Sequence, residues 1–203
     1  RELRCTREEK EVHLYYFIVK HPGRTLVFAN SIGRVRRLAA VLESLQLPAR
    51  ALHAQMQQRQ RLKALDRFRD DPRGVLVATD VAARGLDVQD VRYVVHMDVP
   101  RSMEVFVHRS GRTARADKSG MALSLVGPQE SGAYEAILRA LGVGRVAPLA
   151  VDIAVLPRLR ERLRLAKKAS SAGLEQSVRS RGDAWLVAAA AEAELDMDEA
   201  MEQ

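Results

Sequence analysis

The sequence has a single cysteine, few aromatic residues and no long apolar run. With Cys5 alone, no disulfide can form within the chain, and a reducing compartment is compatible with this composition. No apolar run approaches the ~20 residues of a membrane-spanning helix, and no charged-then-apolar leader opens the chain, so we expect neither membrane insertion nor secretion. Aromatic residues make up 4% of the chain; Phe28 and Phe106 lie in apolar patterns, so we expect them to pack in a core. The chain opens at Arg1 without a methionine, and we expect it to be a fragment of a longer protein.

Positive charge, in contrast, is abundant. The 203 residues include 33 Lys or Arg and 26 Asp or Glu, giving a formal net charge of +7 and a pI near 10.0. Residues 1–157 alone carry 25 basic and 17 acidic side chains, a net charge of +8. We therefore expect affinity for a polyanion in this part of the chain.

The segment from His108 to Arg115 has the pattern of a phosphate-binding site. Its arginines recur every three residues, at 109, 112 and 115, which would place them near one face of a helical turn. Each planar guanidinium can then meet a phosphate oxygen with two hydrogen bonds. The alternative is a solvated basic helix end, although the Gly and His inside the segment argue against it.

Three further segments carry polar residues directly after apolar ones. Residues 78–87 follow the apolar run of residues 74–78, in the order strand, polar turn and short helix. In open α/β sheets ligands collect at the carboxyl ends of the strands, so this turn is expected to meet a nucleotide or an RNA backbone through Thr79, Asp80, Arg84 and Asp87. The other two segments are residues 27–31 and 52–61.

Helices and strands are expected to alternate along the first two thirds of the chain. Thr6 and Glu9 can form a capping box for a helix that reaches Lys20, and Ser31 can cap the helix that follows the strand at 25–29. The pattern then predicts strands at 49–53, 74–78, 92–97 and 122–126, and helices at 58–69, 103–110 and 131–141. Such alternation indicates an α/β fold with a mostly parallel sheet covered by helices on both faces.

We divide the chain into a lead-in helix at 1–22, an α/β domain at 23–145 and a helical extension at 146–203. The pattern predicts a basic helix over 156–181 that leaves the domain, followed by an acidic segment at 183–203 without Lys or Arg. Two helices of opposite charge can pack on each other or on the core. A contact with RNA or a ribosome precursor is the other interpretation.

The four polar segments resemble, in order and spacing, the motifs of the second RecA-like domain of DEAD-box RNA helicases. The resemblance covers residues 22–127 and includes Ala-Thr-Asp-x-x-Ala-Arg-Gly-Leu-Asp at 78–87 and His-Arg-x-Gly-Arg-Thr-x-Arg at 108–115. His108 separates the chain from related helicases that carry Gln there. Two departures are Ala54 and Ala114, where the family has or often has glycine. A methyl group at residue 54 restricts positive φ and close backbone approach, which bears on RNA contact there.

The resemblance implies a role for each matching residue. It implies that Arg112 and Arg115 contact the γ-phosphate of ATP, with Arg115 as the arginine finger. It also implies that Asp87 accepts a hydrogen bond from the nucleotide ribose, and Gly85 lets the backbone come close beside it. A structural pairing of the two arginines with Asp80 or Asp87 is the alternative. The resemblance also implies interdomain contacts, assigned to His108, Arg109 and Asp80, although His108 can equally be a structural helix histidine.

RNA binding is expected at helix N-termini and nearby cations, where free amides suit backbone phosphates. The expected RNA-binding residues are Asn30, Ser31, Arg34, Ala54, Gln55, Thr79 and Arg84, with Gln58 and Arg61 alongside unless these two belong to a solvated helix face. Because aromatic residues are scarce, we expect recognition of sugar and phosphate without sequence preference.

The sequence lacks the Gly-x4-Gly-Lys-Ser/Thr loop, Asp-Glu-Ala-Asp and Ser-Ala-Thr. The resemblance therefore implies the C-terminal half of an ATP-dependent RNA helicase, with the ligands for Mg²⁺ on an N-terminal RecA-like domain of the same protein, and no metal site in this chain. The alternatives are a stand-alone RNA-binding module without ATP turnover, and a DNA helicase, which His108 and Thr113 disfavour.

Finer resemblance points to the nucleolar helicases of large ribosomal subunit assembly. It rests on residues 15–17, on residues 27–31, and on the basic helix followed by a Trp-Ala-Glu tail. It implies pre-ribosomal particles as partners, and the nucleus and nucleolus as location.

Overall fold

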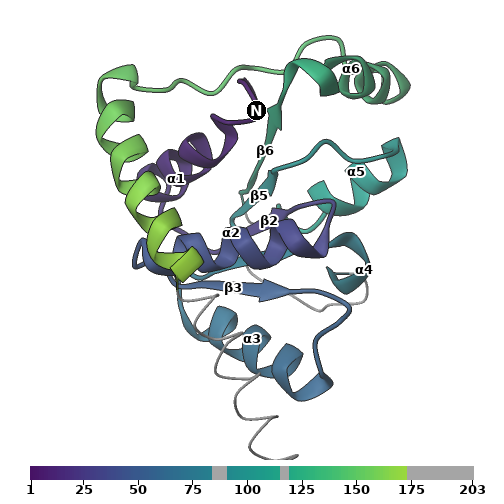
Figure 1. Cartoon of the computed structure of the whole chain (residues 1–203). Helices are drawn as coiled ribbons and strands as arrows, with labels where there is room; N and C mark the ends of the chain where they lie inside the picture. Colours follow the sequence, from purple (N-terminus) through teal and green to yellow (C-terminus); the bar gives the residue numbers. More distant parts are fainter. Residues whose placement is uncertain (84–90, 115–118, 173–203) are drawn as a thin grey trace, which may run out of the picture.

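Parallel strands form one sheet at the centre of the computed structural model, which describes residues 1–83, 91–114 and 119–172. Across these residues six strands occur in the order β1-β6-β5-β2-β4-β3, and every neighbouring pair is parallel (Figure 1). Their bounds are β1 Glu2–Arg4, β2 Thr25–Phe28, β3 Ala49–Leu52, β4 Val75–Ala78, β5 Tyr93–His96 and β6 Met121–Val126. The predicted parallel α/β sheet is confirmed.

Helices connect the parallel strands and cover both faces of the sheet. They are α1 Lys10–Lys20, α2 Ile32–Ser44, α3 Gln58–Asp70, α4 Asp80–Ala83, α5 Met103–Ser110 and α6 Ser131–Ala140. The core on one side of the sheet joins α1 and α2, whereas α3 and α4 pack on the other side and α6 packs on α5. Figure 1 shows α2 and α3 on opposite sides of β3.

Alternating side chains along the buried strands build these two cores. Val27, Val77 and Val95 face α1 and α2, whereas Leu26 and Leu76 face α3, because successive strand residues point to opposite faces. Ser31 caps α2 as predicted, its Oγ accepting a hydrogen bond from Arg34 N at 3.2 Å.

The lead-in segment also belongs to this sheet and core. Thr6 and Glu9 exchange the hydrogen bonds of the predicted capping box, and Leu14 and Phe17 of α1 are fully buried. Strand β1 was not predicted. Three residues with charges at both ends carry no periodic signal, and only pairing with β6, with Leu3 opposite Leu125, makes them a strand.

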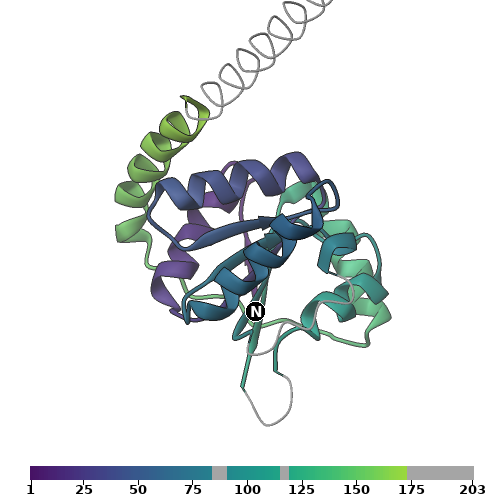
Figure 2. The same ribbon diagram turned by 90° about the horizontal axis from the view of Figure 1, so that it is seen from below.

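The C-terminal helix, residues 156–172, corrects the expectation of a basic helix that leaves the domain. Over these residues it packs on α1 and α2, with Leu156, Leu163 and Ala166 buried in their core (Figure 2). Cations on the helix meet α1: Arg160 bonds Glu9 at 2.8 Å, Lys167 bonds Glu11 at 2.6 Å, and Arg162 lies over the Tyr15 ring at 5.9 Å. The remainder of the predicted helix and the acidic segment lie outside the described residues.

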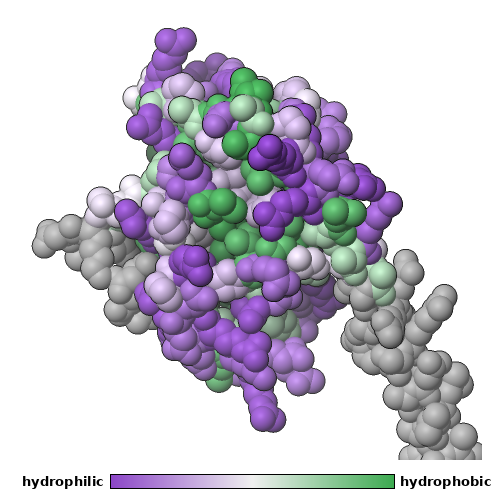
Figure 3. Space-filling view, turned by 90° about the vertical axis from the view of Figure 1, so that its left-hand side faces the viewer, coloured by the Kyte–Doolittle hydropathy of each residue, from purple (hydrophilic) through white to green (hydrophobic). Residues whose placement is uncertain are grey.

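Apolar side chains also remain on the outside of this region. Figure 3 looks onto the side that carries the C-terminal helix, where apolar residues lie among hydrophilic ones. Leu165 is 53% exposed and Ile153, in the turn before the helix, 75% exposed. No helix among the described residues is long and apolar enough to cross a membrane.

Leu163 and Leu165 provide a matched test of the docked helix. We expect Leu163→Ala to lower the free energy of unfolding by about 2–4 kcal/mol, because it leaves a cavity against α1. Leu165→Ala makes the same chemical change at an exposed position and is expected to cost under about 0.5 kcal/mol. Urea unfolding of both variants measures the difference; equal small losses would show that the helix does not dock.

Candidate functional site

Three of the four polar segments of the sequence meet at the carboxyl edge of the sheet, together with residues 97–99, which no sequence pattern marked. Residues 29–31 follow β2, residues 79 and 80 follow β4, residues 97–99 follow β5, and α5 carries the first residues of the arginine segment. Because β2 lies between β4 and β5, the turns after these three strands are neighbours. Polar residues that follow separate strands therefore lie close together at one edge of the sheet.

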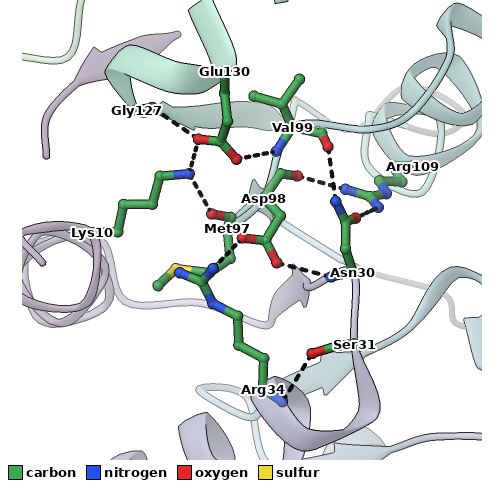
Figure 4. Close-up of polar contacts among 10 residues, drawn as sticks. All are labelled: Lys10, Asn30, Ser31, Arg34, Met97, Asp98, Val99, Arg109, Gly127 and Glu130. Carbon is green, nitrogen blue, oxygen red and sulfur yellow. Dashed lines mark hydrogen bonds and ion pairs between the residues drawn. The ribbon is translucent and has the colours of Figure 1, made fainter. Parts of the chain in front are cut away.

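Arg109 connects these turns from a buried position. Its side chain is 1% exposed, and its Nε and Nη2 bond the two carboxylate oxygens of Asp80 at 2.6 and 2.8 Å. Nη1 donates to the backbone oxygen of Asp98 at 2.8 Å, and Nη2 also donates to Asn30 Oδ1 at 2.7 Å (Figure 4). The guanidinium also lies over the Phe28 ring, 5.2 Å from its centroid. Each nitrogen of the guanidinium thus donates a hydrogen bond to another group of the domain.

Residues 97–99, after β5, bond to the turn after β2 and to the start of α2. The Asp98 carboxylate accepts from Asn30 N at 2.9 Å and pairs with Arg34, and Asn30 Nδ2 donates to Val99 O at 3.1 Å (Figure 4). Of the three residues expected to bind RNA here, Asn30 and Arg34 therefore have partners within the domain. Ser31 is exposed, and its hydroxyl caps α2.

Lys10 and Glu130 extend the same network, and sequence reasoning missed them. Lys10 is 1% exposed; its Nζ pairs with Glu130 and donates to Met97 O at 2.9 Å. Glu130 also accepts from Gly127 N at 2.9 Å and Val99 N at 3.3 Å. Burial raises the pKa of the Glu130 carboxyl, but the bonds from Lys10 and the two amides outweigh it and lower the pKa overall. The signal in the sequence was a lysine at the start of a helix with a long apolar run at 14–19.

His96, which sequence reasoning also missed, packs behind Arg109. It is fully buried, stacks on Phe106 with ring centroids 4.8 Å apart, and its Nε2 lies 3.2 Å from Ser110 Oγ. Burial, with a further contribution from the Arg109 charge, lowers the pKa of His96 to about 3. The ring is therefore neutral at physiological pH and does not compete with Arg109 for its carboxylate.

The arginine segment continues beyond α5. Because α5 ends at Ser110, Arg112 lies past the helix and is partly exposed, in contrast to buried Arg109, so these two arginines do not share the expected helix face. Exposed His108 and Arg112 border a small cavity of about 20 Å³ together with Asp80. Arg84, Gly85, Asp87 and Arg115 lie outside the described residues.

Ala114 adopts a left-handed conformation, with φ at 54°. A side chain is disfavoured there, which explains why glycine would suit the position that the sequence analysis singled out. Thr113 anchors the turn, since its buried hydroxyl donates to the backbone oxygens of Val91 and Arg92, at 2.7 and 3.0 Å. Ala54 differs: among described non-glycine residues positive φ occurs at Gln46 and Ala114 alone, so the backbone at 54 does not need glycine.

The turn after β3 lies beside this edge. Arg36 of α2 donates to His53 Nε2 at 3.0 Å and to Gln55 Oε1 at 3.1 Å, which orients the turn that carries Ala54. Burial and the Arg36 charge lower the pKa of His53. The backbone of Thr79 donates to Leu52 O at 3.3 Å, so Thr79, Ala54 and Gln55 lie along one edge. No cluster of metal-binding side chains occurs within the described part of the chain.

Comparison with known proteins agrees with this arrangement. The family model for the helicase conserved C-terminal domain matches residues 9–117. The chain is 44% identical to ATP-dependent RNA helicase ddx24 of Dictyostelium discoideum over 194 residues, which are 96% of this chain and 20% of that protein. It is 41% identical to human ATP-dependent RNA helicase DDX24, over 98% of this chain and 23% of the relative, and 39% identical to mak5 of Schizosaccharomyces pombe, over 94% and 30%. The chain thus spans less than a third of the length of these relatives.

Solved structures of similar fold include DEAD-box proteins. The Escherichia coli DEAD-box protein SrmB, crystallised with regulator of ribonuclease activity A, superposes with a TM-score of 0.67 at 35% identity, over 76% of this chain and 91% of that chain. The C-terminal domain of the DEAD-box protein Dbp5 superposes with a TM-score of 0.66 at 25% identity, over 82% and 95%. The chain therefore belongs to the helicase conserved C-terminal domain family, as a C-terminal RecA-like domain of the DEAD-box type.

Proposed function

We propose that this chain is the C-terminal half of an ATP-dependent RNA helicase. In this proposal it holds the RNA backbone and supplies the arginine finger for ATP hydrolysis, together with an N-terminal RecA-like domain of the same protein. The observation that carries the proposal is the Arg109 network, which joins the turns of three strands and the arginine segment at one edge. The names of the relatives, all ATP-dependent RNA helicases, support it.

For ATP we propose that Arg112 and Arg115 act on the γ-phosphate and that Gly85 and Asp87 contact the ribose. A guanidinium at the phosphate neutralises charge that develops on the oxygens during transfer, so it lowers the barrier more than it strengthens binding. In this proposal the ligands for Mg²⁺ would belong to the N-terminal domain, and the ion would neutralise phosphate charge when ATP is bound. Thr113 anchors the turn at Ala114, which directly precedes Arg115 in the sequence.

For RNA we propose direct contacts from Ser31, Thr79, Ala54, Gln55 and Arg84. Asn30 and Arg34 support these contacts indirectly, because their bonds to residues 98 and 99 set the position of the Ser31 turn. Hydroxyl and amide groups along this edge suit phosphate and sugar, so binding is indifferent to sequence.

For the contact between domains we propose His108, which is exposed. Arg109 and Asp80 bind each other inside the domain, so we assign them the role of holding the site together.

A finer proposal places the protein in assembly of the large ribosomal subunit, in the nucleolus, with pre-ribosomal particles as partners. It rests on the sequence resemblance and is compatible with the relatives named DDX24 and Mak5. Pre-ribosomal RNA should co-purify with the tagged full-length protein; consistent recovery of messenger RNA alone would contradict the proposal.

The function is tested by Arg115 in the protein that contains both RecA-like domains. Arg115→Ala should lower RNA-stimulated ATP turnover at least about 100-fold, because the finger acts on transition-state charge. Arg115→Lys should restore little, since an ammonium lacks the planar fork. The 203-residue chain alone should show no ATPase above background. Wild-type turnover in Arg115→Ala would overturn the assigned role.

Salt dependence tests the electrostatic character of RNA binding. If about four phosphates are neutralised, log K for single-stranded RNA should fall with log salt with a slope near −3. Fluorescence anisotropy with oligo(U) and a mixed sequence at several salt concentrations measures it. An affinity that ignores salt, or that depends strongly on sequence, would refute the proposal.

Neighbouring residues test the role of Arg109. Arg109→Ala should lower the free energy of unfolding by about 3–5 kcal/mol, because it removes one partner of a buried ion pair. His108→Ala, one residue earlier and exposed, should change stability by less than about 0.5 kcal/mol while lowering ATP turnover in the two-domain protein. Equal stability of the two variants in urea unfolding would show that Arg109 is not structural.

A further inference from the structure

A groove of about 690 Å³ adjoins the proposed RNA edge at Ser31 and extends beyond it. It runs between the turn before α1, the first turns of α2 and the turn after β6. The described residues that matter for its chemistry are Arg7, Ser31, Arg34, Arg37 and Gln129. Figure 4 draws several of the residues that line it, among them Lys10, Asp98 and Glu130.

The acidic groups of this groove are mostly neutralised within the protein. Asp98 pairs with Arg34, and Glu130 pairs with Lys10 and accepts from two backbone amides. Arg7 and Arg37 are exposed and form no hydrogen bond or ion pair with any residue the structure describes. Of the acidic side chains, only exposed Glu8 remains opposite them within the described lining. The groove thus presents two guanidiniums available to an anion.

The distribution of charge on α2 also favours an anion in this groove. Its first turn contains no acidic residue but carries Arg34, and Arg37 follows in the second turn. Cations there face the positive end of the helix dipole, which is unfavourable unless anions are nearby. Asp98 supplies one such anion to Arg34, whereas Arg37 has none.

We propose that this groove binds the backbone of single-stranded RNA outside the nucleotides held at Ser31 and Thr79, with Arg7 and Arg37 each contacting a phosphate. The proposal rests on the proposed function, because Ser31 lines both the groove and the RNA edge and so makes one continuous path. The described lining includes hydroxyl, amide and guanidinium groups and no large apolar or aromatic side chain. Such a surface suits phosphate and 2′-hydroxyl groups, whereas a protein partner would need apolar contact at its centre.

The test compares two lengths of RNA with the full 203-residue chain. Oligo(U) of about 6 and about 12 nucleotides lies within the range that one nucleic-acid-binding domain covers. In Arg7→Gln/Arg37→Gln, the affinity for the longer RNA should fall about 10-fold, and its salt slope should become shallower by about 1.4, which corresponds to two phosphates at 0.7 each. Affinity for the shorter RNA should remain within about twofold, since it fills the Ser31–Thr79 edge.

Arg67→Gln/Arg73→Gln is the matched control. These arginines are also exposed, and they line a second groove at the opposite edge of the sheet, near the starts of β3 and β4. The control removes the same charge and should leave binding of both RNAs within about twofold of wild type. Because all four arginines are exposed, the thermal midpoints of the two double variants should match that of wild type.

Equal weakening by both double variants would mean that net charge alone matters, and it would overturn the groove proposal. So would unchanged binding of the longer RNA in Arg7→Gln/Arg37→Gln, including the case in which that variant loses only binding to an acidic peptide. If wild type binds the shorter RNA and gains nothing from the longer one, the groove proposal fails while the proposed function stands. If wild type binds neither RNA, both fail.

Discussion

The buried guanidinium of Arg109 is the interaction on which the functional edge depends. A charge at 1% exposure is tolerated only when its donors are satisfied, and here Asp80, the Asp98 carbonyl and Asn30 satisfy them. These partners follow three different strands, so the turns after β2, β4 and β5 are fixed relative to one another by one side chain. The arrangement also explains why Asp80, although part of a polar turn, is unavailable as an independent ligand.

Residues 97–99 extend this constraint across the edge. All three residues accept hydrogen bonds. Met97 accepts one from Lys10, Asp98 accepts from Arg109 and Asn30, and Val99 accepts a second one from Asn30. The proposed RNA turn at Ser31 and the arginine segment therefore share one rigid backbone support. Lys10 and Glu130 hold that support from the far side, which gives the lead-in helix a part in shaping the site.

Positive charge in this protein serves two purposes that the net value of +7 does not separate. On the C-terminal helix, Arg160 and Lys167 are used in ion pairs with α1, and Arg162 lies over an aromatic ring, so these cations attach the helix to the domain. In the groove beside α2, Arg7 and Arg37 have no such partners among the described residues and remain available to a polyanion. Pairing within the fold thus decides which of the basic side chains are left for a polyanion.

The parallel α/β fold, the capping of α1 and α2, and the position of Thr79 and Asp80 at the carboxyl end of a strand could be predicted from the sequence. These follow from hydrophobic periodicity, cap residues and strand direction, which are properties of short segments. Long-range packing determines that β1 joins the sheet, that Lys10 pairs with Glu130, that residues 156–172 dock on α1, and that Arg109 is buried while Arg112 is partly exposed. Each of these depends on a partner distant in sequence, and spacing along a helix fixes which residues share a face without fixing which face meets the core.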